Sequence, residues 1–256
     1  KAVELNPKYV DAFNNIGLVY YAREDYARAR DSYLKAVEID PNYAIGHYNL
    51  GLAYYQLKNY APSMRHYQKS IELRPNYMYA YYGLGLTYYA LQNYDKAMEY
   101  YQMAIDLDPR YDHVYYAAGL IYNARKQYDE AIRYYEKCLE VNPKYANAFF
   151  AIGLVYYYQG QYELSIENYQ RSIELNPDFD SNYYNIGLAY YALQDHMTAI
   201  FNYQKALQLN SGNANAYHAL GLAAAAAGNL DLAVQAYEEF IRRFPDHYNI
   251  ETVKNL

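Results

Sequence analysis

The sequence predicts an all-α protein built from repeated helix pairs, and three residue series predict it. A glycine, a tyrosine and a proline each recur every 34 residues. A fixed period of this length is typical of a repeat array whose unit is two helices. The members are Gly17, Gly51, Gly85, Gly119, Gly153, Gly187 and Gly221; Tyr33, Tyr67, Tyr101, Tyr135, Tyr169, Tyr203 and Tyr237; and Pro7, Pro41, Pro75, Pro109, Pro143, Pro177 and, after Ser211, Pro245.

The period divides the chain into seven units, which we expect to form one continuous array over residues 1–256 because each unit contacts mainly its neighbours. Residues 1–9 align with the end of the first full unit, so we expect them to be the end of a truncated upstream unit. Residues 248–256 lack the glycine and tyrosine series, and we expect a C-terminal cap there. The units are 10–43, 44–77, 78–111, 112–145, 146–179, 180–213 and 214–247.

The third unit illustrates the elements expected in each. A first helix is predicted over 79–91, a turn over 92–94 and a second helix over 95–107. Asp95 favours the start of the second helix, and Asp108-Pro109 ends it, since a residue before proline leaves the helical region. Gly85 falls inside the first helix, where it costs about 1 kcal/mol relative to alanine. That cost indicates a close approach of the two helices.

The same unit carries a motif of a known family. Tyr81, Leu84, Gly85, Tyr88, Ala97, Tyr101, Ala104 and Pro109 have the order and spacing typical of the tetratricopeptide repeat (TPR). The chain therefore resembles this family over nearly its whole length. The resemblance implies an all-α, right-handed superhelical solenoid whose first helices line a concave, partner-binding groove. It does not imply a particular partner, because one fold hosts many functions.

A second apolar stripe on the first helices marks the candidate groove. Its members follow the i, i+4, i+7 spacing of one helix face. Two explanations stay open, an open apolar groove or packing between adjacent first helices. The groove residues are Tyr48, Leu52, Tyr55, Tyr82, Leu86, Tyr89, Tyr116, Leu120, Asn123, Phe150, Leu154, Tyr157, Tyr184, Leu188 and Tyr191.

Two known uses of the family are tested by residue type. The groove slots hold no Lys or Arg, so the carboxylate clamp of chaperone-tail binders is not expected. Asn15, Asn49 and Asn185 match the asparagine ladder of sugar-transferase repeat arms, but the same position holds no asparagine in the repeats between Asn49 and Asn185. We therefore include these three asparagines as candidate binding residues at the ends of the array.

Other classes of function are disfavoured by composition. Lys and Arg number 22 against 28 Asp and Glu, so a basic nucleic-acid surface is not expected. The six histidines fall at six different positions of the 34-residue period, and the single cysteine, Cys138, stands where other repeats have a small residue. No metal site, cofactor or catalytic residue is therefore expected. No apolar run is long enough for direct membrane insertion.

The sequence thus predicts a non-enzymatic scaffold that binds an apolar or aromatic peptide or helix of another protein in the groove. One alternative is self-association into oligomers or filaments, because contacts between unlike surfaces of identical chains need not close. Another is the substrate-recognition arm of a larger enzyme. The sequence indicates no compartment.

Overall fold

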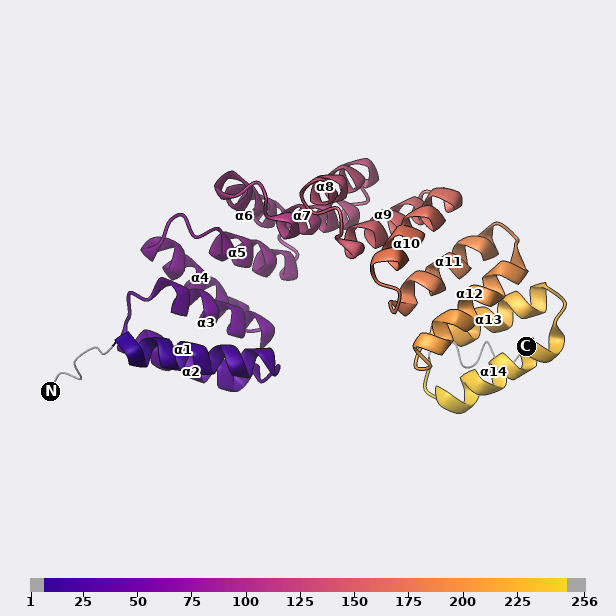
Figure 1. The fold of residues 1–256 in the computed structure, drawn as a ribbon, viewed down its shortest axis with the longest axis horizontal. Helices are drawn as coiled ribbons and strands as arrows, with labels where there is room; N and C mark the ends of the chain where they lie inside the picture. The colour runs from indigo at the N-terminus through magenta and orange to yellow at the C-terminus, as the bar shows by residue number, and fades with distance from the viewer. Residues whose placement is uncertain (1–6, 248–256) are drawn as a thin grey trace. The chain divides into compact units, whose positions relative to one another are not determined.

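The computed structural model describes residues 7–247, which form fourteen α-helices and, over that range, no β-strand. The all-α repeat fold predicted from the sequence is therefore confirmed (Figure 1). The helices are α1 (Pro7–Ala22), α2 (Tyr26–Ile39), α3 (Ala44–Gln56), α4 (Tyr60–Leu73), α5 (Met78–Ala90), α6 (Tyr94–Leu107), α7 (Asp112–Ala124), α8 (Tyr128–Val141), α9 (Ala146–Tyr158), α10 (Tyr162–Leu175), α11 (Asp180–Ala192), α12 (His196–Leu209), α13 (Ala214–Ala226) and α14 (Leu230–Arg243).

The chain divides into two compact units, each described here by itself. The first, Lys1–Arg125, contains α1 to α7, and the second, Lys126–Leu256, contains α8 to α14. Within each unit every helix contacts the next in sequence, and odd-numbered helices also contact one another. The odd-numbered helices of a unit therefore lie side by side, as the first helices of stacked repeats do.

The predicted ends lie mostly outside the described residues. The structure describes neither residues 1–6 nor residues 248–256, so the upstream partial unit and the C-terminal cap stay predictions. Residues 7–9, which the sequence analysis assigns to that partial unit, form the first turn of α1. Proline is tolerated there, since the first N–H groups of a helix have no partner within it.

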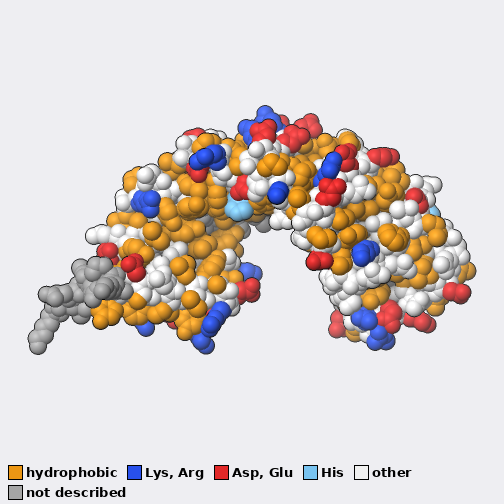
Figure 2. Space-filling model, viewed as in Figure 1, with side chains coloured by type: hydrophobic (Ala, Val, Ile, Leu, Met, Phe, Trp, Pro, Cys, Tyr) orange, Lys and Arg blue, Asp and Glu red, His pale blue; other side chains and the backbone are white. Residues whose placement is uncertain are grey.

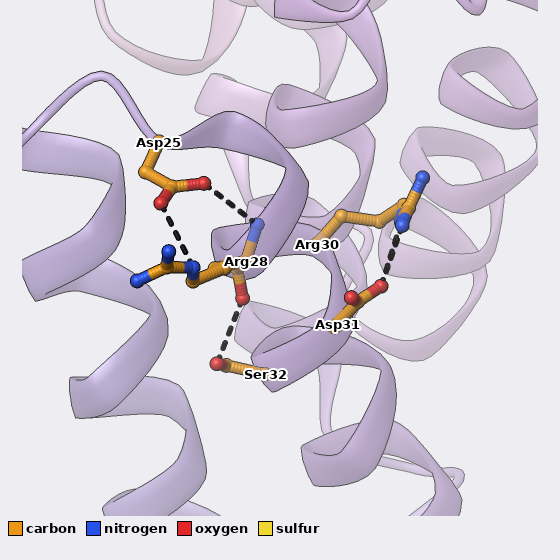
Figure 3. A network of polar contacts seen from close by, with 5 residues as sticks. All are labelled: Asp25, Arg28, Arg30, Asp31 and Ser32. Carbon is orange, nitrogen blue, oxygen red and sulfur yellow. Dashed lines mark hydrogen bonds and ion pairs between the residues drawn. The ribbon is translucent and has the colours of Figure 1, made fainter.

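Side-chain caps mark the start of four of the second helices, α2, α6, α12 and α14. Asn93 accepts a hydrogen bond from the backbone N–H of Lys96 (3.2 Å), so α6 begins at Tyr94, which had been predicted to lie in the turn. Asp25 caps α2 in the same way, accepting from the Arg28 N–H at 3.1 Å (Figure 3). An N–O distance of 3.2 Å joins the Asp25 carboxylate to the Arg28 guanidinium as well.

The turn inside each repeat reverses the chain through one left-handed residue. In the third repeat this residue is Gln92, with φ of 58°. Its N–H donates to the Tyr89 carbonyl, and the Asn93 N–H donates to the Tyr88 carbonyl, which is the Schellman arrangement. Within residues 7–247 the left-handed residues are Glu24, Lys58, Gln92, Lys126, Gly160, Gln194 and Gly228.

The core of each repeat is a tyrosine ring packed against the mid-helix glycine. An added Cβ at Gly85 would lie under 3.0 Å from the Tyr101 ring, which is fully buried. The close approach predicted from the cost of a helical glycine is therefore confirmed, and its partner is the tyrosine sixteen residues later. The pairs described are Gly17–Tyr33, Gly51–Tyr67, Gly85–Tyr101, Gly153–Tyr169, Gly187–Tyr203 and Gly221–Tyr237.

We expect Gly85→Ala to lower the free energy of unfolding by about 1–3 kcal/mol, the usual cost of overpacking, despite alanine's better helix propensity. The measurement is urea unfolding of the parent and the variant. The control is the same substitution in a Tyr101→Leu background, where the smaller side chain leaves room for the methyl group and the cost should shrink. Equal costs in both backgrounds would contradict the proposed contact.

Candidate partner-binding face

The stripe predicted as a groove lies on odd-numbered helices in both units, and every one of its side chains is half-buried. We call this stripe the apolar face. In Figure 2, apolar side chains cover much of the visible surface of both units between scattered acidic and basic groups. The apolar face comprises Tyr48, Leu52 and Tyr55 on α3; Tyr82, Leu86 and Tyr89 on α5; Tyr116, Leu120 and Asn123 on α7; Phe150, Leu154 and Tyr157 on α9; and Tyr184, Leu188 and Tyr191 on α11.

The first ring of each helix in this face also packs between repeats. Tyr82 lies 5.8 Å, centroid to centroid, from the buried Tyr101 ring and meets Tyr111 of the following turn edge-on at 5.2 Å. Burial, and then the neighbouring Tyr79, raise the pKa of Tyr111 to about 12. Tyr48 and Phe150 make the equivalent contacts, so this row contributes to stability as well as to the surface.

On α3, α5, α9 and α11 the last ring of the face packs across the turn within its own repeat. Tyr89 lies 5.7 Å from the first ring of the next helix, Tyr94, and burial raises its pKa above the ordinary value. Equivalent ring pairs are Tyr21–Tyr26, Tyr55–Tyr60, Tyr157–Tyr162 and Tyr191–His196. Contacts between aromatic rings therefore hold both rows in place.

A leucine lies between the two rings on α3, α5, α9 and α11, and Leu120 lies between Tyr116 and Asn123 on α7. Leu154 and Leu188 pack partly against core clusters of the second unit and stay partly open to solvent. Rings and leucines alike are partly packed and partly exposed. The open groove and the packed interface therefore both stay predictions. None of the residues of the apolar face is charged, so it can bury apolar groups but offers no ion pair to a ligand.

The three candidate asparagines differ in environment. Asn49 is buried, and its amide donates to the Asn14 side-chain oxygen at 2.8 Å. Asn185 donates to the Ser181 carbonyl at 2.7 Å. Asn15 is exposed. Because two of the three amides are already engaged within the chain, asparagine capture of a peptide backbone is a weaker hypothesis than apolar binding.

Two histidines that the sequence analysis treated as unrelated lie side by side. The Nδ1 atoms of His47 on α3 and His66 on α4 are 3.1 Å apart, and His47 Nε2 lies 3.0 Å from the Pro41 carbonyl. His47 Nε2 therefore donates to that carbonyl, its Nδ1 accepts, and the His66 Nδ1–H donates to it. Tyr54 stacks on the His66 ring at 5.6 Å.

The third repeat shows the origin of this histidine pair, because tyrosines stand at the two equivalent positions there. Tyr81 and Tyr100 each lie 34 residues after a histidine, and the Tyr81 hydroxyl donates to the Pro75 carbonyl as His47 does to Pro41. Tyr88 and Tyr100 stack at 5.4 Å. The sequence could have indicated this pair, because both histidines stand in one repeat at positions where the third repeat has tyrosines.

Within residues 7–247, His, Cys, Asp and Glu form no group of three or more placed to hold a metal ion. None of the helices described there has the length and apolar character needed to cross a membrane.

Comparisons with known proteins agree on the repeat. A TPR repeat model matches residues 17–58, 119–160 and 153–194, a tetratricopeptide repeat model matches 44–77, 79–111 and 183–213, and a further tetratricopeptide repeat model matches 215–247. No curated protein matches the chain.

Solved structures with a similar fold share little sequence with the chain. PilW, a type IV pilus biogenesis factor, is 20% identical with a TM-score of 0.73, over 82% of this chain and 98% of its own. YrrB, described as a TPR protein with an unusual peptide-binding site, is 24% identical with a TM-score of 0.60, over 74% and 98%. A tetratricopeptide repeat protein from Parabacteroides merdae is 19% identical with a TM-score of 0.67, over 97% of each chain.

The histidine pair predicts a pH-dependent stability. Burial, then the neighbouring His47 and Arg65, lower the pKa of His66 from 6.5 to about 4. Between these values the unfolded chain binds more protons than the folded one, so the free energy of unfolding should fall as the pH drops from about 6.5 towards 4. We expect a loss on the order of 1–2 kcal/mol, because partial exposure of His66 moderates the effect.

The measurement is urea unfolding across that pH window for the parent and for His66→Tyr, which places in this slot the residue found at Tyr100. The variant should lose less stability than the parent on acidification. An equal loss in both proteins would show that His66 does not titrate as described.

Proposed function

The chain belongs to the tetratricopeptide repeat family, and on that basis we propose that its apolar face binds an apolar or aromatic segment of another protein. The repeats indicate a protein–protein interaction scaffold, and proteins of this family are generally non-enzymatic. The finer assignment depends on one observation, the half-open leucine between two tyrosine rings that recurs on neighbouring helices.

The spacing of this surface favours a continuous ligand. In the first unit Leu52, Leu86 and Leu120 lie on α3, α5 and α7, and each helix contacts the next odd-numbered one. An amphipathic helix offers apolar side chains at i, i+3, i+4 and i+7, which can meet consecutive leucines of such a surface. Tyrosine is favoured at interaction hot spots because it offers a large, rigid contact area.

The chemistry of the face also limits the ligand. The apolar face has no charged side chain to pair with an acidic tail, so a charged ligand would lose its hydration there without compensation. A segment with aromatic or aliphatic side chains gains most from this surface. The peptide-binding site named for YrrB supports the proposal by analogy of fold alone.

We expect Leu86→Asp with Leu120→Asp to weaken binding of such a segment at least about tenfold, because two carboxylates would be buried without partners. The probe is an amphipathic peptide containing tryptophan, selected from a displayed library against the parent chain. The chain itself contains no tryptophan, so the peptide's indole fluorescence reports binding directly.

Met103→Asp is the matched control, because Met103 lies exposed on α6, outside the apolar face, and should leave affinity unchanged. Leu86→Ala is a milder variant that should weaken binding in the same direction while keeping the helix intact. Peptides that bind the Leu86→Asp, Leu120→Asp variant as tightly as the parent would place the binding site elsewhere.

A further inference from the structure

The outer side of α12 exposes two large apolar side chains to water. Met197 and Phe201 are each 66% exposed. They stand four residues apart in one helix, so they are neighbours on the same side of it. We call this pair the Met197–Phe201 ridge. Because α12 is an interior helix that contacts both α11 and α13, the exposure of the ridge does not arise from an end of the chain.

The fold exposes these two positions in every repeat. All twelve equivalent residues are exposed, and ten of them are charged or polar. The ridge is therefore a change in the chemistry of a surface that faces water throughout the array. The equivalents of Met197 are Ala27, Ala61, Asp95, Asp129, Glu163 and Asp231, and those of Phe201 are Asp31, Arg65, Glu99, Arg133, Glu167 and Gln235.

Packing within the chain does not account for the ridge. The core side of α12 consists of Ala199, Ile200 and Tyr203, which pack in one cluster with apolar residues of α13. Met197 and Phe201 take no part in that cluster. A single exposed apolar residue is ordinary on a protein surface, but two neighbours at positions that are otherwise polar form a patch.

Carboxylates border this patch on the preceding even-numbered helix. Glu163 and Glu167 of α10 stand one repeat before Met197 and Phe201, and both are exposed. Stacking of repeats places equivalent positions next to one another along the array. The two glutamates therefore flank the ridge along the side that faces α10.

A third carboxylate lies at the start of α12 itself. Asp195 accepts hydrogen bonds from the Thr198 hydroxyl at 2.7 Å and from its N–H at 3.1 Å. These bonds lower the pKa of Asp195, so its carboxylate is ionised at neutral pH. Residues 162–209, from α10 to α12, hold six acidic residues and two basic ones. The acidic residues are Glu163, Glu167, Glu174, Asp178, Asp180 and Asp195, and the basic ones are Arg171 and Lys205.

The two basic residues leave these carboxylates uncompensated. Arg171 pairs with Glu174, with an N–O distance of 3.1 Å. Lys205 is half-buried towards the other end of α12. Among the described residues, neither Glu163 nor Glu167 forms an ion pair. The ridge is thus an apolar strip with a negative border at the N-terminal half of α12.

We propose that the Met197–Phe201 ridge binds a basic amphipathic helix of another protein. The apolar side chains of that helix cover the ridge, and its lysines and arginines face Glu163, Glu167 and Asp195. Methionine and phenylalanine are both enriched at interfaces between proteins, and methionine adapts its shape to its partner. The same carboxylates repel an anionic membrane surface. Because the ridge lies on an even-numbered helix, it is separate from the apolar face and does not rest on the function proposed for it.

The test uses the full 256-residue chain and a synthetic peptide of about 18 residues, long enough to form a helix. The peptide has leucines at i, i+3, i+4 and i+7, lysines elsewhere and one tryptophan, whose fluorescence reports binding because the chain has none. The parent should bind this peptide, with an affinity that falls at high salt. A matched peptide with glutamate in place of lysine should bind at least about tenfold more weakly.

Two double variants separate the apolar and the charged contributions. Met197→Gln with Phe201→Gln should weaken binding of the lysine peptide at least about tenfold, because it removes the apolar contact. Glutamine already stands at the equivalent Gln235, so the fold accepts it. Glu163→Gln with Glu167→Gln should weaken binding several-fold and reduce its dependence on salt.

Glu136→Gln with Glu140→Gln is the matched control, because it removes two exposed carboxylates from another even-numbered helix, α8. This variant should bind the lysine peptide as the parent does. A Met197→Gln, Phe201→Gln variant that also binds like the parent would overturn the proposal.

Three further outcomes would assign the ridge or the peptide differently, and each overturns the proposal. Binding that is lost in the Leu86→Asp, Leu120→Asp variant would place the peptide on the apolar face. Binding of the parent to uncharged phosphatidylcholine vesicles, without binding of the peptide, would indicate a lipid surface. A parent mass that rises with concentration, in contrast to a monomeric Met197→Gln, Phe201→Gln variant, would assign the ridge to a second copy of the chain.

Discussion

Each repeat depends on the packing of a tyrosine ring against a glycine sixteen residues earlier in the chain. Burying such a ring removes roughly 150–250 Å² from water, worth about 4–6 kcal/mol as an upper estimate at about 25 cal/mol per Å². Two costs oppose this gain. A glycine inside a helix costs about 1 kcal/mol, and the Tyr101 hydroxyl, which is buried without a hydrogen-bond partner, costs about 1–3 kcal/mol. Ring burial outweighs both costs, which explains why a residue with poor helix propensity recurs inside one helix of every repeat.

The buried ring also determines how the apolar face is built. Tyr101 occupies the space between α5 and α6, so Tyr82 of the face rests on it and on Tyr111 of the following turn. A ring held on two sides loses little further conformational freedom when a ligand arrives, and this lowers the entropic cost of binding. Under the proposed function, the contacts that stabilise the repeat also prepare its surface for a partner. The leucines between the rings are half-buried as well.

The sequence predicted the features that recur with the period and missed those that do not. The glycine, tyrosine and proline series predicted the helix pairs and the close approach at Gly85. The start of α6 was misplaced by one residue because the Asn93 cap is a local hydrogen bond that periodicity does not report.

The left-handed turn residue went unnoticed because five of its seven positions, Gln92 among them, hold a residue other than glycine. Contacts between His47 and His66 were missed since their slots differ and only the fold brings them together. Exposure of the leucines could not be predicted, because one spacing serves both a groove and a packed interface.

Departures from the period are what distinguish one repeat of this chain from another. Interior contacts are nearly equivalent, so the fold alone does not decide which even-numbered helix packs on which odd-numbered one. Differences such as the Arg125–Asp95 pair, the Asn14–Asn49 amide contact and the His47–His66 pair occur at single interfaces. A buried polar pair such as Asn14–Asn49 opposes a shifted register, because shifting would leave one buried amide without its partner.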